Sequence, residues 1–246
     1  MKVALFGASK GMGRAVARLL AERGDTLCLL GRDRADLERS AADLSVRGAA
    51  GTVGIVDCDL LEPGSFVPAL DAAVMALGGL DAVVVTAGLF ATQDALERDA
   101  ALRARLLAAD FTNTVLFCEL AREQLMAAGG AKRLCVFSSV AGDRARKPVI
   151  LYGAAKAGLS HYLSGLDYKF HADGLRTILV KPGFVKTGMT AGLPVPPFAG
   201  EPESVAARVV RALDRGTPVV YAPGIWRWVM QIICLLPRAV MRRIAF

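Results

Sequence analysis

Residues 3–24 read VALFGASKGMGRAVARLLAERG, and this stretch decides the fold. The apolar run 3–6 is typical of a strand buried on both faces, and residues 12–23 have the periodicity of a helix. The small residues 7–13 connect the two. A strand that enters a helix through glycines lets backbone N–H groups and the helix dipole approach a pyrophosphate closely. The stretch could be a plain tight turn, but its place after a first strand favours a dinucleotide-binding turn.

The rest of the chain repeats this alternation. Similar apolar runs occur at 26–30, 52–56, 82–85, 134–137 and 177–180, and stretches with helical periodicity lie between them, at 33–46, 65–77 and 99–128. Strands that alternate with helices through short connections predict right-handed crossovers and a parallel sheet. No linker or repeat divides the 246 residues. We therefore expect one α/β domain, 1–246, with a Rossmann-type doubly wound parallel sheet, helices on both faces and a C-terminal amphipathic helical extension.

Composition excludes several classes of protein. A hydrophobic fraction of 54% with 22% charged residues is typical of a globular protein and not of a disordered chain. The five cysteines are scattered without a C-x-x-C pair, and neither histidine has a companion at metal-ligand spacing, so we expect no disulfide framework and no metal. The chain opens directly on a strand, which favours a cytoplasmic location. The net charge of +7 fits an anionic cofactor or a membrane surface, and no nucleic-acid recognition motif accompanies it.

The end of the second strand, Gly31-Arg32-Asp33, is where a dinucleotide fold meets the adenosine ribose. An arginine there suits a 2′-phosphate, so Arg32 together with Lys10 favours NADP(H) over NAD(H). Both could instead be solvated cations, since Asp33 offers Arg32 a local partner. Asp59 follows the third strand and is a candidate for the adenine amino group or for a helix cap near Pro63.

Tyr152 and Lys156 are spaced i and i+4, which places them on one face of a helix. A nearby cation stabilises a phenolate and lowers the pKa of the phenol from its ordinary value near ~10, which suits proton transfer. Ser138 and Ser139 follow the strand 134–137, at the carboxyl edge where such sheets bind ligands. A serine hydroxyl there can hold a carbonyl oxygen.

Together these motifs resemble the single-domain short-chain dehydrogenase/reductase family over nearly the whole chain. The resemblance implies Gly7, Gly11 and Gly13 at the pyrophosphate, and Ser139, Tyr152 and Lys156 as the catalytic trio; Ser139 lies thirteen positions before Tyr152, as the family serine does. Thr86-Ala87-Gly88 resembles the family segment after the fourth strand, and Pro182-Gly183-x-x-x-Thr187 its nicotinamide segment. The residues expected to contact cofactor are Gly7, Ser9, Lys10, Gly11, Met12, Gly13, Arg32, Asp59, Leu60, Ala87, Gly88, Tyr152, Lys156, Pro182, Gly183, Val185 and Thr187.

The chain departs from the family pattern in two places. Val85 and Thr86 stand where the family usually has asparagines, so the centre of the sheet is stabilised differently. Asp110 aligns with the family asparagine that positions a proton-relay water, and Asn113 is the nearby alternative. A carboxylate at that place perturbs the lysine and the phenol differently from an amide.

The resemblance implies an NADPH-dependent carbonyl reductase in which Tyr152 donates a proton, Ser139 polarises the oxygen and Lys156 holds the ribose and tunes the phenol. A regulatory NADP(H)-binding protein without turnover is an alternative, although a sensor needs only the cofactor half. The reductase half of an epimerase pair is another. Family members of this type form homodimers or homotetramers, which we expect here too.

Residues 224–246 form an unusual tail. From 216 onwards the chain has four arginines and no acidic residue, so this part carries +4 of the net charge. The apolar core 228–236 is too short for the about 20 residues that span a bilayer. Tryptophans beside an apolar helix with arginines predict a segment lying at the inner face of the membrane, or alternatively an oligomer contact.

The Pro/Gly-rich loop 188–200 is a candidate substrate lid, since Met189, Leu193 and Phe198 suit an apolar substrate; the alternative is an ordinary surface loop. The tail and residues 181–190 resemble the branch of the family that contains decaprenylphosphoryl-2-keto-pentose reductases. That resemblance implies a hydrophobic or lipid-linked ketone as the substrate.

Overall fold

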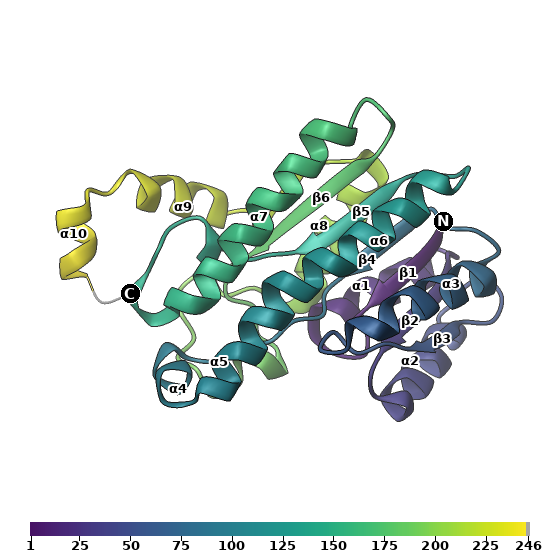
Figure 1. Cartoon of the computed structure of the whole chain (residues 1–246), viewed down its shortest axis with the longest axis horizontal. Helices are drawn as coiled ribbons and strands as arrows, with labels where there is room; N and C mark the ends of the chain where they lie inside the picture. Colours follow the sequence, from purple (N-terminus) through teal and green to yellow (C-terminus); the bar gives the residue numbers. More distant parts are fainter. Residues whose placement is uncertain (245–246) are drawn as a thin grey trace.

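The computed structural model describes residues 1–244 and contains one seven-stranded sheet (Figure 1). The strand order is β3-β2-β1-β4-β5-β6-β7, and every neighbouring pair is parallel. Ala245 and Phe246, the end of the predicted segment 224–246, lie outside the described residues. The strands are β1 (Lys2–Phe6), β2 (Thr26–Gly31), β3 (Gly54–Asp57), β4 (Ala82–Val85), β5 (Arg133–Phe137), β6 (Arg176–Pro182) and β7 (Val219–Ala222).

Helices cover both faces of the sheet, which confirms the predicted doubly wound fold. One face packs against α1 (Gly11–Glu22), α2 (Arg34–Val46) and α8 (Pro202–Arg215). The other packs against α3 (Phe66–Leu77), α6 (Thr114–Ala127) and α7 (Ile150–Phe170), which lie across the near side of the sheet in Figure 1. In β1, Val3 and Leu5 enter the first core while Ala4 and Phe6 enter the second. Alternation along a strand thus fills two cores at once.

The structure corrects three details of the sequence analysis. The third strand begins two residues later than the predicted 52–56. The sequence analysis missed the seventh strand, β7, a four-residue strand at the edge of the sheet in which Val219 is 44% exposed. The predicted helix 99–128 is instead α5 (Ala100–Leu107), a π-helical turn (Ala108–Asn113) and α6, and the short α4 (Gln93–Arg98) precedes them.

The π-helical turn is stabilised by a side chain. Thr114 Oγ1 donates a hydrogen bond to the carbonyl of Ala109, five residues earlier, at 2.6 Å. Such turns interrupt the regular helical hydrogen bonds and are frequent at functional sites. This one changes the direction in which Asp110 and Asn113 leave the helix.

The C-terminal part of the chain forms two short helices, α9 (Trp226–Leu235) and α10 (Arg238–Arg243), which extend from the body as an arm (Figure 1, yellow). Within residues 1–244, no helix combines the length and the apolar composition needed to cross a bilayer.

The turn between β1 and α1 is too crowded for side chains. Gly7 has a φ of 93°, and a Cβ on it would stand 2.5 Å from the backbone nitrogen of Ala87. A Cβ on Gly13 would stand 2.4 Å from the carbonyl oxygen of Gly7. Thr86 Oγ1 donates to that same carbonyl at 2.9 Å, so the turn is tied to the end of β4. Glycines here allow the backbone to approach its neighbours closely.

We expect Gly13→Ala to lower the free energy of unfolding by about 1–3 kcal/mol, because the new methyl group overlaps the backbone of Gly7. The control is Gly165→Ala in α7, where the added methyl group meets nothing within 4 Å. That change should raise stability by about 0.5–1 kcal/mol, since alanine favours a helix interior more than glycine does. Urea unfolding of both variants is the measurement, and equal effects would contradict the crowding argument.

Candidate active site

A cleft of about 420 Å³ lies at the carboxyl ends of β1, β2 and β4. Most of the predicted cofactor residues line it: Gly7, Ser9, Lys10, Gly11, Met12, Gly13, Arg32, Asp59, Leu60, Ala87, Gly88 and Thr187. The other predicted residues lie outside this lining, with Pro182, Gly183 and Val185 at and after the end of β6 and Tyr152 and Lys156 on α7. The structure therefore separates a cofactor-sized cleft from a neighbouring group of polar side chains.

Thr187 closes the cleft from the side of β6. Its Cγ2 lies 3.4 Å from the place where a Cβ on Gly11 would stand. The turn after β1 and the segment after β6, far apart in the sequence, thus face each other across the opening.

The end of the cleft near β2 contains charges of both signs. Lys10 Nζ lies 2.7 Å from the carboxylate of Asp36, and hydrogen bonds from Lys10 and Arg39 hold the pKa of Asp36 below its ordinary value. Asp33 does not pair with Arg32 but caps α2, accepting the N–H of Asp36 at 3.0 Å. Within residues 1–244, Arg32 forms no ion pair. Of the two predicted cations, Lys10 shares the Asp36 carboxylate with Arg39, and Arg32 is the one without an ion pair among the described residues.

Asp59 lines the cleft and shapes the turn after β3. Its Oδ1 accepts the N–H of Leu61 at 2.9 Å, and its own N–H donates to Ser65 Oγ at 3.2 Å. The carboxylate therefore organises the turn after β3 while it faces the cleft. It does not cap the helix near Pro63 as the alternative expected, because Glu62 and Ser65 stand at the N-cap positions of the 3-10 turn 63–65 and of α3.

Tyr152 and Lys156 lie near each other in the first turns of α7. Lys156 Nζ is 5.6 Å from the centroid of the Tyr152 ring and donates to the carbonyl of Phe137 at 3.4 Å. Phe90 meets the Tyr152 ring edge to face, with the ring centroids 5.1 Å apart. The phenol is thus held between a cation and an aromatic ring at the carboxyl end of β5.

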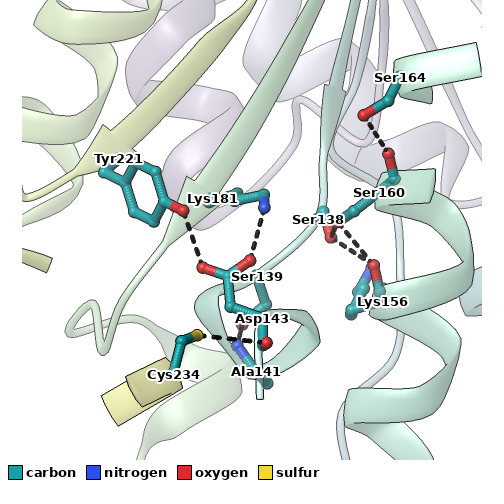
Figure 2. Close-up of polar contacts among 10 residues, drawn as sticks. All are labelled: Ser138, Ser139, Ala141, Asp143, Lys156, Ser160, Ser164, Lys181, Tyr221 and Cys234. Carbon is teal, nitrogen blue, oxygen red and sulfur yellow. Dashed lines mark hydrogen bonds and ion pairs between the residues drawn. The ribbon is translucent and has the colours of Figure 1, made fainter. Parts of the chain in front are cut away.

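The two serines after β5 point in different directions (Figure 2). Ser138 is buried, and its Oγ lies 2.9 Å from the carbonyl of Lys156 and 2.8 Å from Ser160 Oγ, so it joins β5 to α7. Ser139 begins a short 3-10 turn, where its Oγ accepts the N–H of Ala141 at 3.1 Å, and its hydroxyl lies near enough to Tyr152 to lower the pKa of the phenol. Only Ser139 is placed beside the phenol.

Asp110 lies beside Lys156, whereas Asn113 does not. Asp110 Oδ1 is 3.6 Å from Lys156 Nζ and accepts the N–H of Leu89 at 2.8 Å, and its side chain is completely buried. A Cβ on Gly88 would stand 2.8 Å from that oxygen, so a glycine is required where the cleft meets this pair. Asn113 instead donates to the carbonyl of Leu60 at 2.9 Å.

Burial and charge set the pKa values of these groups. Burial raises the pKa of Tyr152; the charge of Lys156 lowers it and that of Asp110 raises it, and the net direction is upward. The expected lowering by Lys156 is therefore present but is outweighed. Burial lowers the pKa of Lys156, but Asp110 and Tyr152 raise it more, so this lysine is an ammonium ion at neutral pH. Burial raises the pKa of Asp110, and Lys156 offsets only part of that rise.

The sequence analysis missed Trp226, which supports the segment after β6. The Trp226 ring lies directly over Gly183, within 2.1 Å of where a Cβ would stand. Its Nε1 donates to the carbonyl of Phe198 at 3.2 Å, so it also holds the loop 188–200. Trp226 packs in one apolar cluster with Val140, the residue after Ser139. The arm thereby supports the segment after β6 and the turn that follows Ser139.

Asp143 is a second residue that the sequence analysis missed. Its carboxylate accepts hydrogen bonds from Lys181 Nζ at 2.5 Å and Tyr221 OH at 2.9 Å, and its carbonyl accepts one from Cys234 Sγ at 3.4 Å (Figure 2). It lies four positions after Ser139 and joins that turn to β6, β7 and α9. No sequence motif marks it, because its partners are distant along the chain.

Comparison with known proteins identifies the family to which the chain is similar. A family model described as short chain dehydrogenase matches residues 2–195. An uncharacterized oxidoreductase of Mycobacterium tuberculosis is 36% identical over 242 residues, which cover 98% of this chain and 96% of that protein. Carbonyl reductase family member 4 of Xenopus tropicalis is 30% identical over 224 residues, 86% of this chain and 90% of that one. The fold matches a short-chain type dehydrogenase/reductase from Mycobacterium ulcerans with a TM-score of 0.79 at 21% identity, covering 89% of this chain and 86% of that chain.

We expect Asp143→Asn to lower the free energy of unfolding by about 3 kcal/mol, because it leaves the charge of Lys181 without a partner in a nearly buried place. Glu201→Gln is the matched control. It breaks a Lys186 pair that is also 2.5 Å long but about half exposed, and such pairs contribute about 0–1 kcal/mol. Chemical denaturation compares the two variants, and a loss for Asp143→Asn no greater than for the control would contradict the assigned role.

Proposed function

This chain belongs to the short-chain dehydrogenase family, and we propose that it reduces an apolar ketone with hydride from NADPH. Membership makes the chain an oxidoreductase that uses NAD(P)(H). The observation that carries the finer proposal is the grouping of Ser139, Tyr152 and Lys156 at the end of β5, beside a glycine-lined cleft. The relative named as a carbonyl reductase supports the same direction.

The cleft fits a dinucleotide. At Gly7 and Gly13 the neighbouring backbone leaves room for a hydrogen atom on the α carbon but not for a side chain. A pyrophosphate bound against the start of α1 requires such a tight glycine turn. Arg32, the unpaired cation at the adenosine end, would bind a 2′-phosphate, and Lys156 and Thr187 would hold the nicotinamide half. When bound, the nicotinamide supplies the hydride that converts a ketone carbon to an alcohol carbon.

The side chains of this protein complete the reduction. In the proposed mechanism Ser139 Oγ donates a hydrogen bond to the carbonyl oxygen of the substrate, and Tyr152 OH transfers its proton to that oxygen as the alcohol forms. A Tyr152 pKa above its ordinary value keeps the phenol protonated and ready to act as the acid. The ammonium group of Lys156 then stabilises the phenolate until it recovers a proton from solvent.

Asp110 is proposed as a positioning residue. It keeps Lys156 charged and orients the backbone of Leu89, which follows the cleft residue Gly88. Because its carboxylate also raises the pKa of Tyr152, it favours the protonated phenol that reduction needs.

The proposed substrate is a ketone on a hydrophobic or lipid-linked carrier, such as a polyprenyl-phosphate-linked keto sugar. The loop 188–200 supports this choice, since Met189 is 48% exposed and Val195 and Phe198 are each 59% exposed. These side chains gain an apolar contact when such a molecule enters.

We expect Tyr152→Phe to lower NADPH oxidation by about 10²–10⁴-fold with every ketone that the wild type reduces, because the proton donor is lost. NADPH binding, followed by cofactor fluorescence, should change little. Tyr168→Phe on the same helix, where the tyrosine is 84% exposed, is the control and should retain full activity. If Tyr152→Phe keeps substantial turnover, the mechanism is excluded. If no ketone in a panel of keto sugars, long-chain ketones and diketones is reduced by the wild type, a regulatory protein becomes the better assignment.

We expect Arg32→Ala to weaken NADPH binding by about tenfold or more and to leave NADH binding nearly unchanged, because only NADPH carries the 2′-phosphate. The control, Arg34→Ala, removes an arginine that is already engaged with Glu38 and Asp57 and should alter neither affinity. Titration of both cofactors against both variants is the measurement. Equal losses for the two cofactors would contradict the proposed preference.

A further inference from the structure

A second hollow, of about 490 Å³, lies between α8, β7 and the start of α9. Four arginines line it, Arg208, Arg211, Arg215 and Arg227, and no acidic residue does. The Arg208 guanidinium lies against Gly224, within 2.7 Å of where a Cβ would stand, so a glycine there makes room for it. The hollow therefore concentrates positive charge on one side of the molecule.

These arginines are not neutralised by the protein. Within residues 1–244 none of the four forms an ion pair. Asp214, which lies between two of them in α8, pairs with Arg23 at 2.5 Å instead. Clustered cations without carboxylate partners repel one another, and an anionic partner would relieve that repulsion.

An exposed apolar stripe begins at the same hollow. Ile225, Trp228, Ile232 and Leu235 are 42%, 61%, 66% and 84% exposed, and their spacing places them on one face of α9. Trp228 belongs to both the stripe and the lining of the hollow. The opposite face of α9 is covered, because Trp226, Met230 and Ile233 pack with Val140.

We propose that the arginine hollow and the α9 stripe together form a docking surface for an anionic lipid bilayer. Lipid phosphates enter the hollow, the Trp228 ring lies at headgroup depth and the stripe enters the boundary of the acyl chains. Arg238, Arg242 and Arg243 of α10 are exposed on the same arm (Figure 1) and add to the attraction.

A second copy of this chain fits the surface less well. Two-fold association through one patch brings each residue near its own counterpart, so the four unpaired arginines would face another four. A bilayer with negative headgroups offers both opposite charge and apolar depth, which a copy of the chain does not.

Docking places the bilayer next to the candidate active site. Arg144 donates to the carbonyl of Leu236 at 2.8 Å, and Lys147 donates to that of Arg242 at 2.7 Å. Arg144 and Lys147 both belong to the segment between Ser139 and Tyr152. A lipid-borne ketone could then reach the site from the membrane, and this last step alone rests on the proposed function.

The test uses the full chain and flotation with vesicles of two compositions, phosphatidylcholine alone or mixed equally with phosphatidylglycerol. We expect the wild type to float with the mixed vesicles at low salt and to be released at high salt, with little binding to phosphatidylcholine alone. Arg211→Glu with Arg215→Glu should lower the partition coefficient by about tenfold or more. Arg98→Glu with Arg105→Glu, exposed arginines of α4 and α5, changes the net charge equally and should bind like wild type.

The stripe is tested separately by Ile232→Ser with Leu235→Ser, which should also lower binding about tenfold or more. Val46→Ser with Met75→Ser, at side chains 91% and 82% exposed elsewhere, is the control. Tryptophan fluorescence gives a readout without mutation. The chain has two tryptophans, and Trp226 is buried, so quenching by brominated lipid reports Trp228.

Failure of the wild type to float with anionic vesicles at low salt would overturn the proposal, as would equal losses in the arginine variant and its control. The stripe would instead be assigned to contact with a second copy of the chain if two results came together. Light scattering would show a wild-type dimer that the stripe variant fails to form, and the wild type would not bind vesicles. Tyr152→Phe should float like wild type, so loss of the reductase assignment and loss of the docking assignment are distinguishable.

Discussion

The ammonium group of Lys156 is buried, and a buried cation is stable only beside a compensating charge. Asp110 supplies that charge from 3.6 Å away. Because Asp110 leaves a π-helical turn and also accepts the N–H of Leu89, the pair fixes three elements relative to one another: α7, the turn between α5 and α6, and the segment after β4. The positions of Tyr152 on α7 and of Gly88 at the cleft both depend on it.

The sequence predicted those features of the fold and the site that depend on residues close to one another in the chain. Six of the strands, the glycine turn and the placement of Tyr152 and Lys156 on one helix follow from periodicity and spacing, and the structure has each of them. The pairing of Lys10 with Asp36 was not predictable, because it depends on how the first turn meets α2. The same holds for Asp143, whose partners Lys181 and Tyr221 come from β6 and β7. The family pattern did point to Asp110 ahead of Asn113, and the structure places Asp110 beside Lys156 and Asn113 against Leu60.

The two faces of α9 have different environments although both are apolar. One face contacts Val140 and, through Trp226, lies over Gly183 at the end of β6. The other face consists of the exposed side chains of Ile225, Trp228, Ile232 and Leu235. A helix of ten residues thus lies between the apolar cluster around Val140 and the exposed outer stripe.

The contact between Trp226 and Gly183 has a practical consequence for anyone who shortens this protein. The family model ends at residue 195, so a cut before residue 224 leaves the matched region intact. Such a truncation would remove the Trp226 ring that packs on Gly183 and the hydrogen bond from Trp226 to the carbonyl of Phe198. It would also expose the apolar side chains of Val140 and Phe184 to water. The shortened protein would lose the support of the segment after β6 along with its arm, so a defect in catalysis could not be separated in it from the loss of any contact that the arm makes.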